Sequence, residues 1–143
     1  MIEITLEQYM MGRDKKYSSE LLPEYIANAE KLLVVVNKCL NKIANDAPYI
    51  TFEIHPVNKS LVSSGWRPAA VNAKTPGSSV KSKHMTCNAI DIYDPDGDID
   101  DFLVTNESIL KEFGLYLEHP SATKGWCHLQ QIPPNSKKVI FYP

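Results

Sequence analysis

The sequence predicts an α+β domain in which N-terminal helices pack on a mostly antiparallel sheet. Apolar residues recur at helical spacing in residues 1–48, whereas short strand-like segments occupy most of residues 50–143. Helices that come first and strands that follow, interrupted by one helix, are typical of α+β domains. The length of 143 residues suits one domain across residues 1–143.

Two helices are expected in the first 48 residues. Thr5 and Gln8 have the spacing of a capping box, so a short helix should begin after Thr5 and end near Gly12. Pro23 suits the first turn of a second helix. Apolar residues then repeat at helical spacing, which predicts a helix over about residues 23–45 with one face on the core.

Six strands and one further helix are expected after residue 48. Alternation of apolar and polar residues predicts the strands, the last of them at an edge of the sheet. They are expected at residues 50–54, 61–65, 88–93, 115–118, 126–130 and 139–142. Residues 99–113 have the pattern of an amphipathic helix with Gly114 as its C-cap. Residues 72–81, rich in Asn, Pro, Gly and Ser, are expected to form a loop.

The composition excludes several classes of protein. A net charge of −2 and a pI of about 6.1 give no sign of nucleic-acid binding, and no apolar run is long enough to predict membrane insertion. The first residues do not resemble a signal peptide, so we expect synthesis in the cytoplasm. The three cysteines lack C-x-x-C spacing and are expected to be reduced thiols. Nothing in the sequence demands more than a monomer.

Three side chains are candidate metal ligands: His84, Asp91 and His128. Two imidazoles and one carboxylate suit a zinc ion that keeps one open coordination position, where a water molecule can be activated. If the strands of Asp91 and His128 are neighbours, both side chains can enter one cleft, with His84 on the loop that leads into the first strand. From spacing alone, three unrelated side chains remain an equal alternative.

Three segments resemble motifs of zinc D-Ala-D-Ala carboxypeptidases and related peptidoglycan peptidases. Residues 82–91, S-K-H-M-T-C-N-A-I-D, resemble the motif S-x-H-x-x-G-x-A-x-D, and residues 126–128, W-C-H, resemble the motif W-x-H. Residues 62–72, V-S-S-G-W-R-P-A-A-V-N, are similar to the stretch S-G-Y-R-x-P-x-x-N. The resemblance covers about residues 60–130 and implies the hedgehog/DD-peptidase fold. The chain looks most like small bacteriophage-encoded members, which are lysis or tail-associated enzymes.

The resemblance implies one zinc ion per chain, held by His84, Asp91 and His128. It further implies hydrolysis of peptide bonds in peptidoglycan stem peptides, as a carboxypeptidase or an endopeptidase. The enzyme would then reach the bacterial cell wall by phage delivery or by release at lysis.

Three other residues receive roles from the resemblance. Arg67 is expected to bind a substrate carboxylate or to polarise the scissile carbonyl, because the guanidinium is a rigid fork of donors. Ser82 is expected to orient the loop of His84 by a hydrogen bond, and Trp126 to form a wall of the substrate site.

The chain departs from the family pattern at two positions. Cys87 replaces a glycine; a positive φ there would strain it, and an extra soft ligand is the alternative reading. Gly125 stands three residues before the last histidine, where many members have Glu or Asp. Glu118 is the expected general base instead, with His119 as the second candidate. Glu118 could also be an edge carboxylate or a residue that orients a ligand histidine.

Two alternatives to a peptidase come from other functional classes, and the departure at Gly125 favours the first of them. One is a catalytically inactive zinc-containing module of the same fold that binds cell wall or a virion partner. The other is a structural zinc domain, which the lack of a fourth protein ligand disfavours.

The acidic run at residues 94–101 is not expected to bind calcium. Counted from Asp94, the positions of an EF-hand loop that require Gly and Glu hold Ile99 and Thr105. The run is expected to form a turn in which Asp98 or a neighbour caps the next helix.

Overall fold

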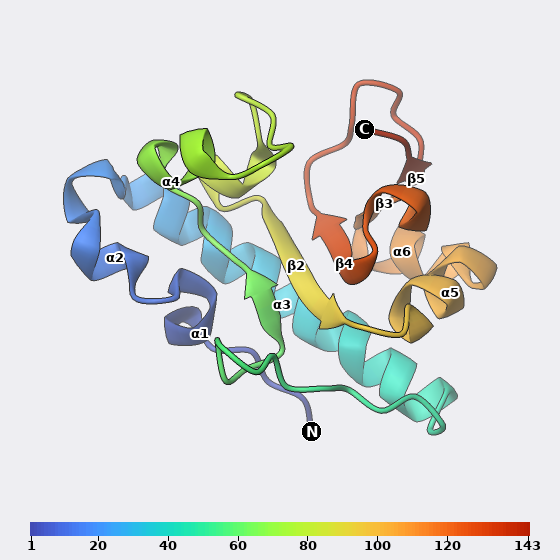
Figure 1. Ribbon diagram of the computed structural model, residues 1–143. Coiled ribbons are helices and arrows are strands. Elements are labelled where there is room, and N and C mark those ends of the chain that lie inside the picture. The colour runs from blue at the N-terminus through green and yellow to red at the C-terminus, as the bar shows by residue number, and fades with distance from the viewer.

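A five-stranded sheet with the strand order β1-β2-β4-β3-β5 lies at the centre of the structure, a computed structural model that describes residues 1–143 (Figure 1). Strands β1, β2, β4 and β3 pair antiparallel, and β5 joins β3 in parallel as an edge strand. The strands are β1 (Val62–Ser64), β2 (Ala89–Asp94), β3 (Tyr116–Glu118), β4 (Gly125–Gln130) and β5 (Ile140–Phe141). The predicted α+β class with a mostly antiparallel sheet is confirmed.

The helices are short apart from one. Figure 1 shows α3 running behind the sheet and α5 and α6 beside the β3–β5 end. The α-helices are α1 (Leu6–Met10), α2 (Arg13–Lys16), α3 (Pro23–Asp46), α4 (Ala69–Lys74), α5 (Asp98–Thr105) and α6 (Glu107–Phe113). The 3-10 helices are η1 (Ser18–Glu20), η2 (Lys83–Thr86) and η3 (Pro120–Ala122). None of these helices combines the length and the apolar character that a membrane crossing requires.

Both predicted N-terminal helices are present. The capping box at α1 is formed by the Thr5 and Gln8 side chains, each of which accepts from the other residue's backbone N–H. Pro23 opens α3, where its missing N–H removes no helical hydrogen bond. Asn37 and Asn41 on α3 accept hydrogen bonds from the backbone of Ile4 and Ile2, which holds the first residues of the chain along the helix.

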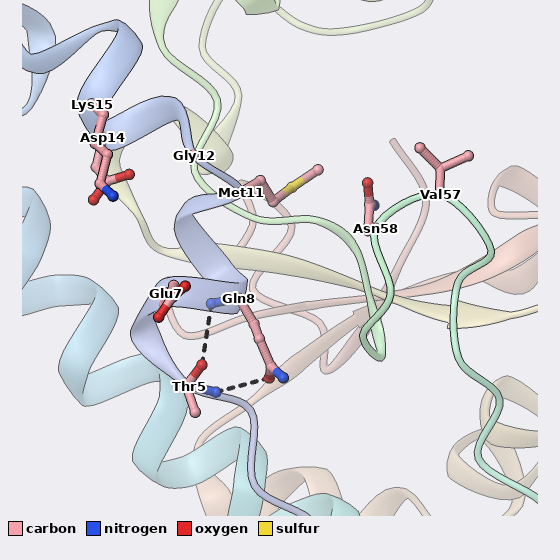
Figure 2. Close-up of a pocket in the computed structure, with 9 residues that line it drawn as sticks. All are labelled: Thr5, Glu7, Gln8, Met11, Gly12, Asp14, Lys15, Val57 and Asn58. Carbon is pink, nitrogen blue, oxygen red and sulfur yellow. Dashed lines mark hydrogen bonds between the residues drawn. The ribbon is translucent and has the colours of Figure 1, made fainter.

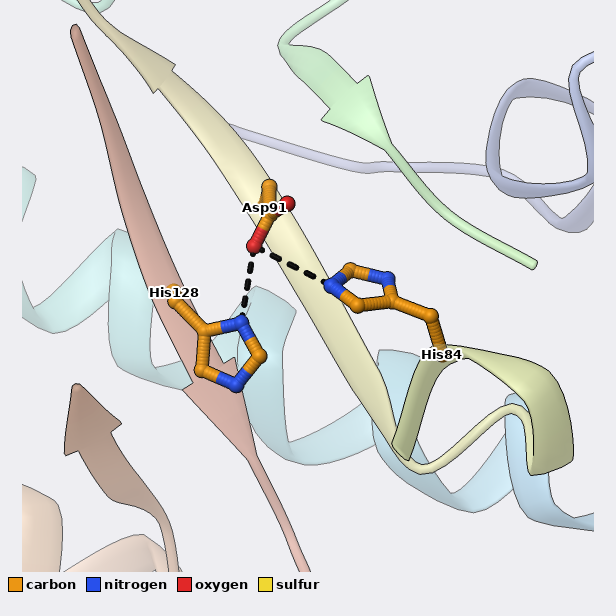
Figure 3. Close-up of side chains that lie close together, drawn as sticks. All are labelled: His84, Asp91 and His128. Carbon is orange, nitrogen blue, oxygen red and sulfur yellow. Dashed lines mark hydrogen bonds and ion pairs between the residues drawn. The ribbon is translucent and has the colours of Figure 1, made fainter. Parts of the chain in front are cut away.

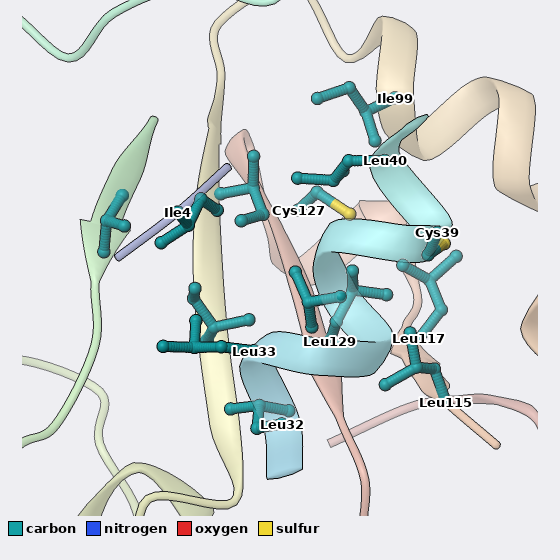
Figure 4. Close-up of a cluster of buried hydrophobic side chains, with 14 of the residues drawn as sticks. Ile4, Leu32, Leu33, Cys39, Leu40, Ile99, Leu115, Leu117, Cys127 and Leu129 are labelled. Atoms are coloured by element: carbon teal, nitrogen blue, oxygen red, sulfur yellow. The ribbon is translucent and has the colours of Figure 1, made fainter. Parts of the chain in front are cut away.

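The apolar face of α3 packs on one face of the sheet (Figure 4). Side chains alternate along a strand, so Ile90 and Ile92 of β2 and Cys127 and Leu129 of β4 face the core. Burial of each such side chain contributes about 1.5–3 kcal/mol to folding. The residues between them on the same strands are therefore free to form a site on the other face.

Residues 50–54 do not form the predicted strand. Only Ile50 is buried, Phe52 is half-buried and Ile54 is 58% exposed. An alternating segment becomes a strand only beside another strand, and β1 pairs with β2 alone. The segment instead leads into a turn in which the His55 N–H donates to the Ser60 carbonyl, so the prediction was wrong.

Three other predictions need correction in detail. The helix expected over residues 99–113 is interrupted at Asn106 (φ −126°, ψ 52°), which separates α5 from α6. The first residues of the loop expected at 72–81 belong to α4. The N-cap of α5 is Gly97, not Asp98, and the carboxylate of Asp94 accepts from the free backbone N–H groups of Ile99 and Asp100. Gly114 does form the C-cap of α6, with φ 64°.

Asp100 is a buried carboxylate at the contact between α5 and the segment before β4. One oxygen accepts a hydrogen bond from the Thr123 hydroxyl at 3.0 Å, and the other has no partner. Burial raises the pKa of Asp100 to about 7. Since the unfolded chain has a carboxyl pKa near 4, the folded state is destabilised as pH rises from about 4 to 7.

Replacement of Asp100 by Asn should therefore change the pH dependence of stability. We expect Asp100→Asn to gain roughly 2–3 kcal/mol relative to the unmodified chain between pH 5 and pH 8, because the amide carries no charge at either pH. Urea unfolding at both pH values measures this difference. The exposed neighbour offers the control Asp101→Asn, which should show no such gain. A pH-independent difference for Asp100→Asn would contradict the prediction.

Candidate functional site

His84, Asp91 and His128 converge on the face of the sheet opposite α3 (Figure 3). All three are buried, and each offers one ligand atom within 4.8 Å of the others. Asp91 on β2 pairs directly with His128 on β4, whereas His84 comes from η2, just before β2. The structure thus brings together the three residues that the sequence selected as candidate ligands.

The Asp91 carboxylate lies at the centre of this group. Its Oδ1 is 2.8 Å from His128 Nδ1 and 3.2 Å from His84 Nε2. Its Oδ2 is 3.8 Å from Arg67 Nη2. Burial alone would raise the pKa of Asp91, but the two histidines outweigh burial and hold it well below its usual range. Asp91 is therefore an anion, as a metal ligand must be.

In each histidine, the ring nitrogen that points away from Asp91 lies within hydrogen-bond distance of an oxygen atom of another residue. His84 Nδ1 lies 2.9 Å from the Gly65 carbonyl oxygen, and His128 Nε2 lies 2.8 Å from Gln130 Oε1. A neutral imidazole carries one N–H, so a proton on the outer nitrogen leaves a lone pair on the inner one. Two such lone pairs and a carboxylate oxygen form a donor set that fits a divalent cation such as zinc.

Glu118 lies at the end of β3, beside this group. The register pairs Leu117 with Leu129, which places Glu118 opposite His128 on the site face of the sheet. The side chain is half-buried. Burial raises the pKa of Glu118, and the negative charge of Asp91 acts in the same direction, against the opposing effect of the histidines.

The second candidate base, His119, makes its contacts elsewhere. Its ring stacks on Tyr142 with centroids 4.4 Å apart, and its Nδ1 is 2.9 Å from the Ser121 hydroxyl. Gly125 begins β4, pairs with Asp94 and has φ 101°. Of these three residues, Glu118 is the one whose carboxylate lies on the face of the sheet that carries the candidate metal ligands.

The remaining predicted residues surround the group. Arg67 is largely buried, and its backbone N–H donates to the His84 carbonyl. The Ser82 hydroxyl accepts from the His84 N–H at 3.3 Å, which is the expected hydrogen bond to this loop. Trp126 is half-buried and lies on the same face of β4 as His128.

Cys87 has the strained backbone that its substitution for glycine predicted. Its φ of 62° places it in the left-handed region at the end of η2. The side chain is fully buried, and burial raises the pKa of the thiol to about 12. Cys87 is not one of the residues whose ligand atoms converge, so the structure favours the strained turn over an extra ligand.

Comparison with known families identifies the chain. A family model described as Peptidase M15 matches residues 53–129, a range that contains the three converging side chains, Arg67 and Glu118. The chain belongs to the Peptidase M15 family. No curated protein and no solved structure matches it. Membership confirms the predicted resemblance to the family of zinc D-Ala-D-Ala carboxypeptidases and makes the chain a metallopeptidase of a family that uses zinc. The likeness to bacteriophage-encoded members stays a prediction.

Two site residues of this M15 peptidase received no role from the sequence. Gln130 is the hydrogen-bond partner of His128, and Asn72 Oδ1 accepts from Arg67 Nη1 at 3.2 Å. Both side chains are buried. The sequence does hold a signal for the contact between Gln130 and His128, because residues two apart on one strand lie on the same face of the sheet. Asn72 is the last residue of the motif that contains Arg67, but only the folded structure shows that the two side chains form a hydrogen bond.

A separate hollow lies between α1 and the turn at residues 55–60 (Figure 2). It is lined mainly by polar and charged side chains, among them Thr5, Glu7 and Asn58. Thr5 is already used in the capping box of α1. The hollow shares no residue with the three candidate metal ligands, so we assign it no part in the reaction.

Gly65 allows the chain to approach α1 closely enough to support His84. A Cβ atom built at Gly65 would lie 1.9 Å from the Tyr9 carbonyl oxygen. Gly65→Ala must therefore displace either α1 or the carbonyl that His84 Nδ1 contacts. We expect it to destabilise the fold by about 3 kcal/mol, as measured by urea unfolding.

Gly77→Ala is the matched control for Gly65→Ala. A Cβ atom at Gly77 would meet nothing within 4 Å, although its φ is 75°. We expect a loss of about 1 kcal/mol from the backbone conformation alone. Equal losses for the two variants would show that the contact with Tyr9 does not restrict residue 65.

Proposed function

We propose that this M15 peptidase hydrolyses peptide bonds in peptidoglycan stem peptides with one zinc ion held by His84, Asp91 and His128. The observation that carries the proposal is the convergence of these three buried ligand side chains beside Glu118. When bound, zinc supplies a Lewis acid that polarises the scissile carbonyl and activates a water molecule. The substrate class is supported by the resemblance of three motifs to those of peptidoglycan peptidases.

Glu118 is the proposed general base. Its carboxylate would accept a proton from the attacking water and pass that proton to the departing amine. The half-buried position suits this exchange, because a carboxyl pKa raised towards neutrality favours both steps. Asp91 does not compete for the role, since its pKa is held low.

Arg67 is the proposed substrate anchor. Its side chain is only 10% exposed, and Asn72 accepts a hydrogen bond from one end of the guanidinium. The remaining N–H donors can bind a substrate carboxylate or the oxygen of the scissile carbonyl, where negative charge develops in the transition state. We propose that Ser82 and Trp126 complete the substrate site beside it.

The setting that we propose is the bacterial cell wall. The protein would be made in the cytoplasm and act as a monomer on wall peptides after phage delivery or release at lysis. Neither nucleic acid nor membrane insertion has a part in this proposal. An acidic chain with a net charge of −2 suits a peptide substrate better than a polyanion.

The Glu118→Gln variant tests the proposed base. We expect at least about 100-fold slower release of stem-peptide fragments from purified peptidoglycan, because the amide cannot accept a proton. Mass spectrometry of the fragments measures the rate and identifies the bond. The exposed Glu112→Gln variant is the control and should cleave at the normal rate. Unchanged cleavage by Glu118→Gln would exclude Glu118 as the base.

Zinc should stabilise the folded chain through the three ligands. At 100 times its Kd, zinc should add about 2.7 kcal/mol to the free energy of unfolding, because it binds the folded state. Unfolding with and without zinc measures this gain, and metal analysis should find one zinc per chain. His84→Ala should lose the gain. His55→Ala should keep it, since His55 Nδ1 accepts from the backbone of Val57 and Asn58 instead.

The inactive module is the second candidate, because Gly125 stands where many relatives have an acid. It would bind zinc and sediment with peptidoglycan, yet release no fragments from any wall chemistry tested. Zinc-dependent cleavage would exclude it.

A further inference from the structure

Phe141 is a buried aromatic residue on the site face of the sheet, beyond the segment that matches the family. It lies on β5, is only 8% exposed and does not belong to the main cluster of buried apolar side chains. The parallel pairing of β3 with β5 places Phe141 directly beside Glu118. Since paired residues of neighbouring strands point to the same side of a sheet, both side chains lie on the face opposite α3.

Phe141 is the last member of a row of four side chains that crosses this face. Asp91 on β2 pairs with His128 on β4. The register of β3 places Glu118 next to His128, and the register of β5 places Phe141 on the far side of Glu118. Glu118 therefore has a candidate metal ligand on one side and a phenyl ring on the other.

The rings of His128 and Phe141 lean toward each other across β3. Their centroids are 6.2 Å apart, and their planes are 82° to each other. β3 lies between the two strands, so their backbones are separated by two strand spacings, roughly 9–10 Å. The rings are thus closer together than the strands that carry them. The phenyl ring occupies the space into which the Glu118 side chain would otherwise turn away from His128.

Three contacts hold β5 in this place, although the strand has only two residues (Figure 1). The Leu117 N–H donates to the Val139 carbonyl oxygen at 2.8 Å. The His119 N–H donates to the Phe141 carbonyl oxygen at 2.7 Å. The ring of Tyr142 stacks on that of His119. Phe141 is therefore fixed relative to β3, the strand that carries Glu118.

We propose that Phe141 is a positioning residue that keeps the Glu118 carboxylate turned toward the metal-ligand group. The proposal rests on the proposed function, in which Glu118 is the general base. A base acts only within hydrogen-bond reach of the proton that it accepts, so a carboxylate that samples other rotamers is in reach for less of the time. Misplacement of a reacting group by about 1 Å can cost about 100-fold in rate. The C-terminal strand would thus complete the site.

A double-mutant cycle between Phe141→Ala and Glu118→Gln tests this role. We expect Phe141→Ala to lower kcat for the release of stem-peptide fragments by about 10–100-fold, with KM and zinc content unchanged. In the Glu118→Gln background the same change should have almost no effect on the residual rate, because the group that Phe141 positions is already lost. An equal loss of rate in both backgrounds would overturn the proposal.

Three further variants make the test specific. Ile140→Ala is the matched control, because Ile140 is the neighbour of Phe141 on β5 but packs against the core; it should weaken the fold in urea and leave kcat unchanged. Phe141→Leu keeps an apolar side chain beside Glu118 and should recover most of the rate. If Phe141→Ala fails to fold, Phe141→Val keeps a residue that favours strands and should show the same dependence on Glu118.

NMR supplies a measurement that requires no activity. In the unmodified chain, three-bond couplings should show one dominant χ1 rotamer for Glu118, and NOEs should connect the rings of Phe141 and His128. In Phe141→Ala the Glu118 couplings should be averaged over several rotamers. A folded Phe141→Ala variant in which Glu118 keeps one rotamer would contradict the proposal. Failure of the proposed function would look different: the couplings would respond to Phe141→Ala, but the unmodified chain would cleave no wall peptide.

Discussion

The antiparallel pairing of β2 with β4 is the constraint on which both the core and the site depend. Six residue pairs align the two strands, from Ala89 with Gln130 to Asp94 with Gly125. Because side chains alternate, this register sends Ile90 and Leu129 to α3 and places Asp91 beside His128 on the other face. A slip by one residue would put the ligands into the core and the apolar side chains into the site. The free energy of core packing therefore also fixes the geometry of the candidate metal centre.

The two carboxylates of the site differ because their surroundings differ. Asp91 has a histidine on either side and Arg67 nearby, which hold its pKa low, so that it remains an anion suited to a cation. Glu118 is half-buried on β3, which pairs with β4, and burial raises its pKa. Carboxylates with pKa values displaced in opposite directions suit separate tasks, one as a ligand and one as an exchanger of protons.

The sequence was sufficient for the parts of the molecule that depend on local pattern. The helix α3, the class of the sheet and the three converging side chains were all predicted, because periodicity and motif spacing are properties of the chain itself. Residues 50–54 alternate as a strand does, yet no strand lies beside them, which a local pattern does not reveal. The contacts of Gln130 depend likewise on partners that only the folded chain supplies.

Tyr9 shows that the support of the site extends beyond the segment that matches the family. Its carbonyl accepts from the Trp66 N–H and lies against Gly65, and its hydroxyl donates to the Ala89 carbonyl at 2.7 Å. The family match begins only at residue 53. A minimal fragment cut to residues 53–129 would thus lack the helix that braces both the support of His84 and the start of β2. We therefore expect the smallest fragment that folds on its own to be larger than the segment that matches the family.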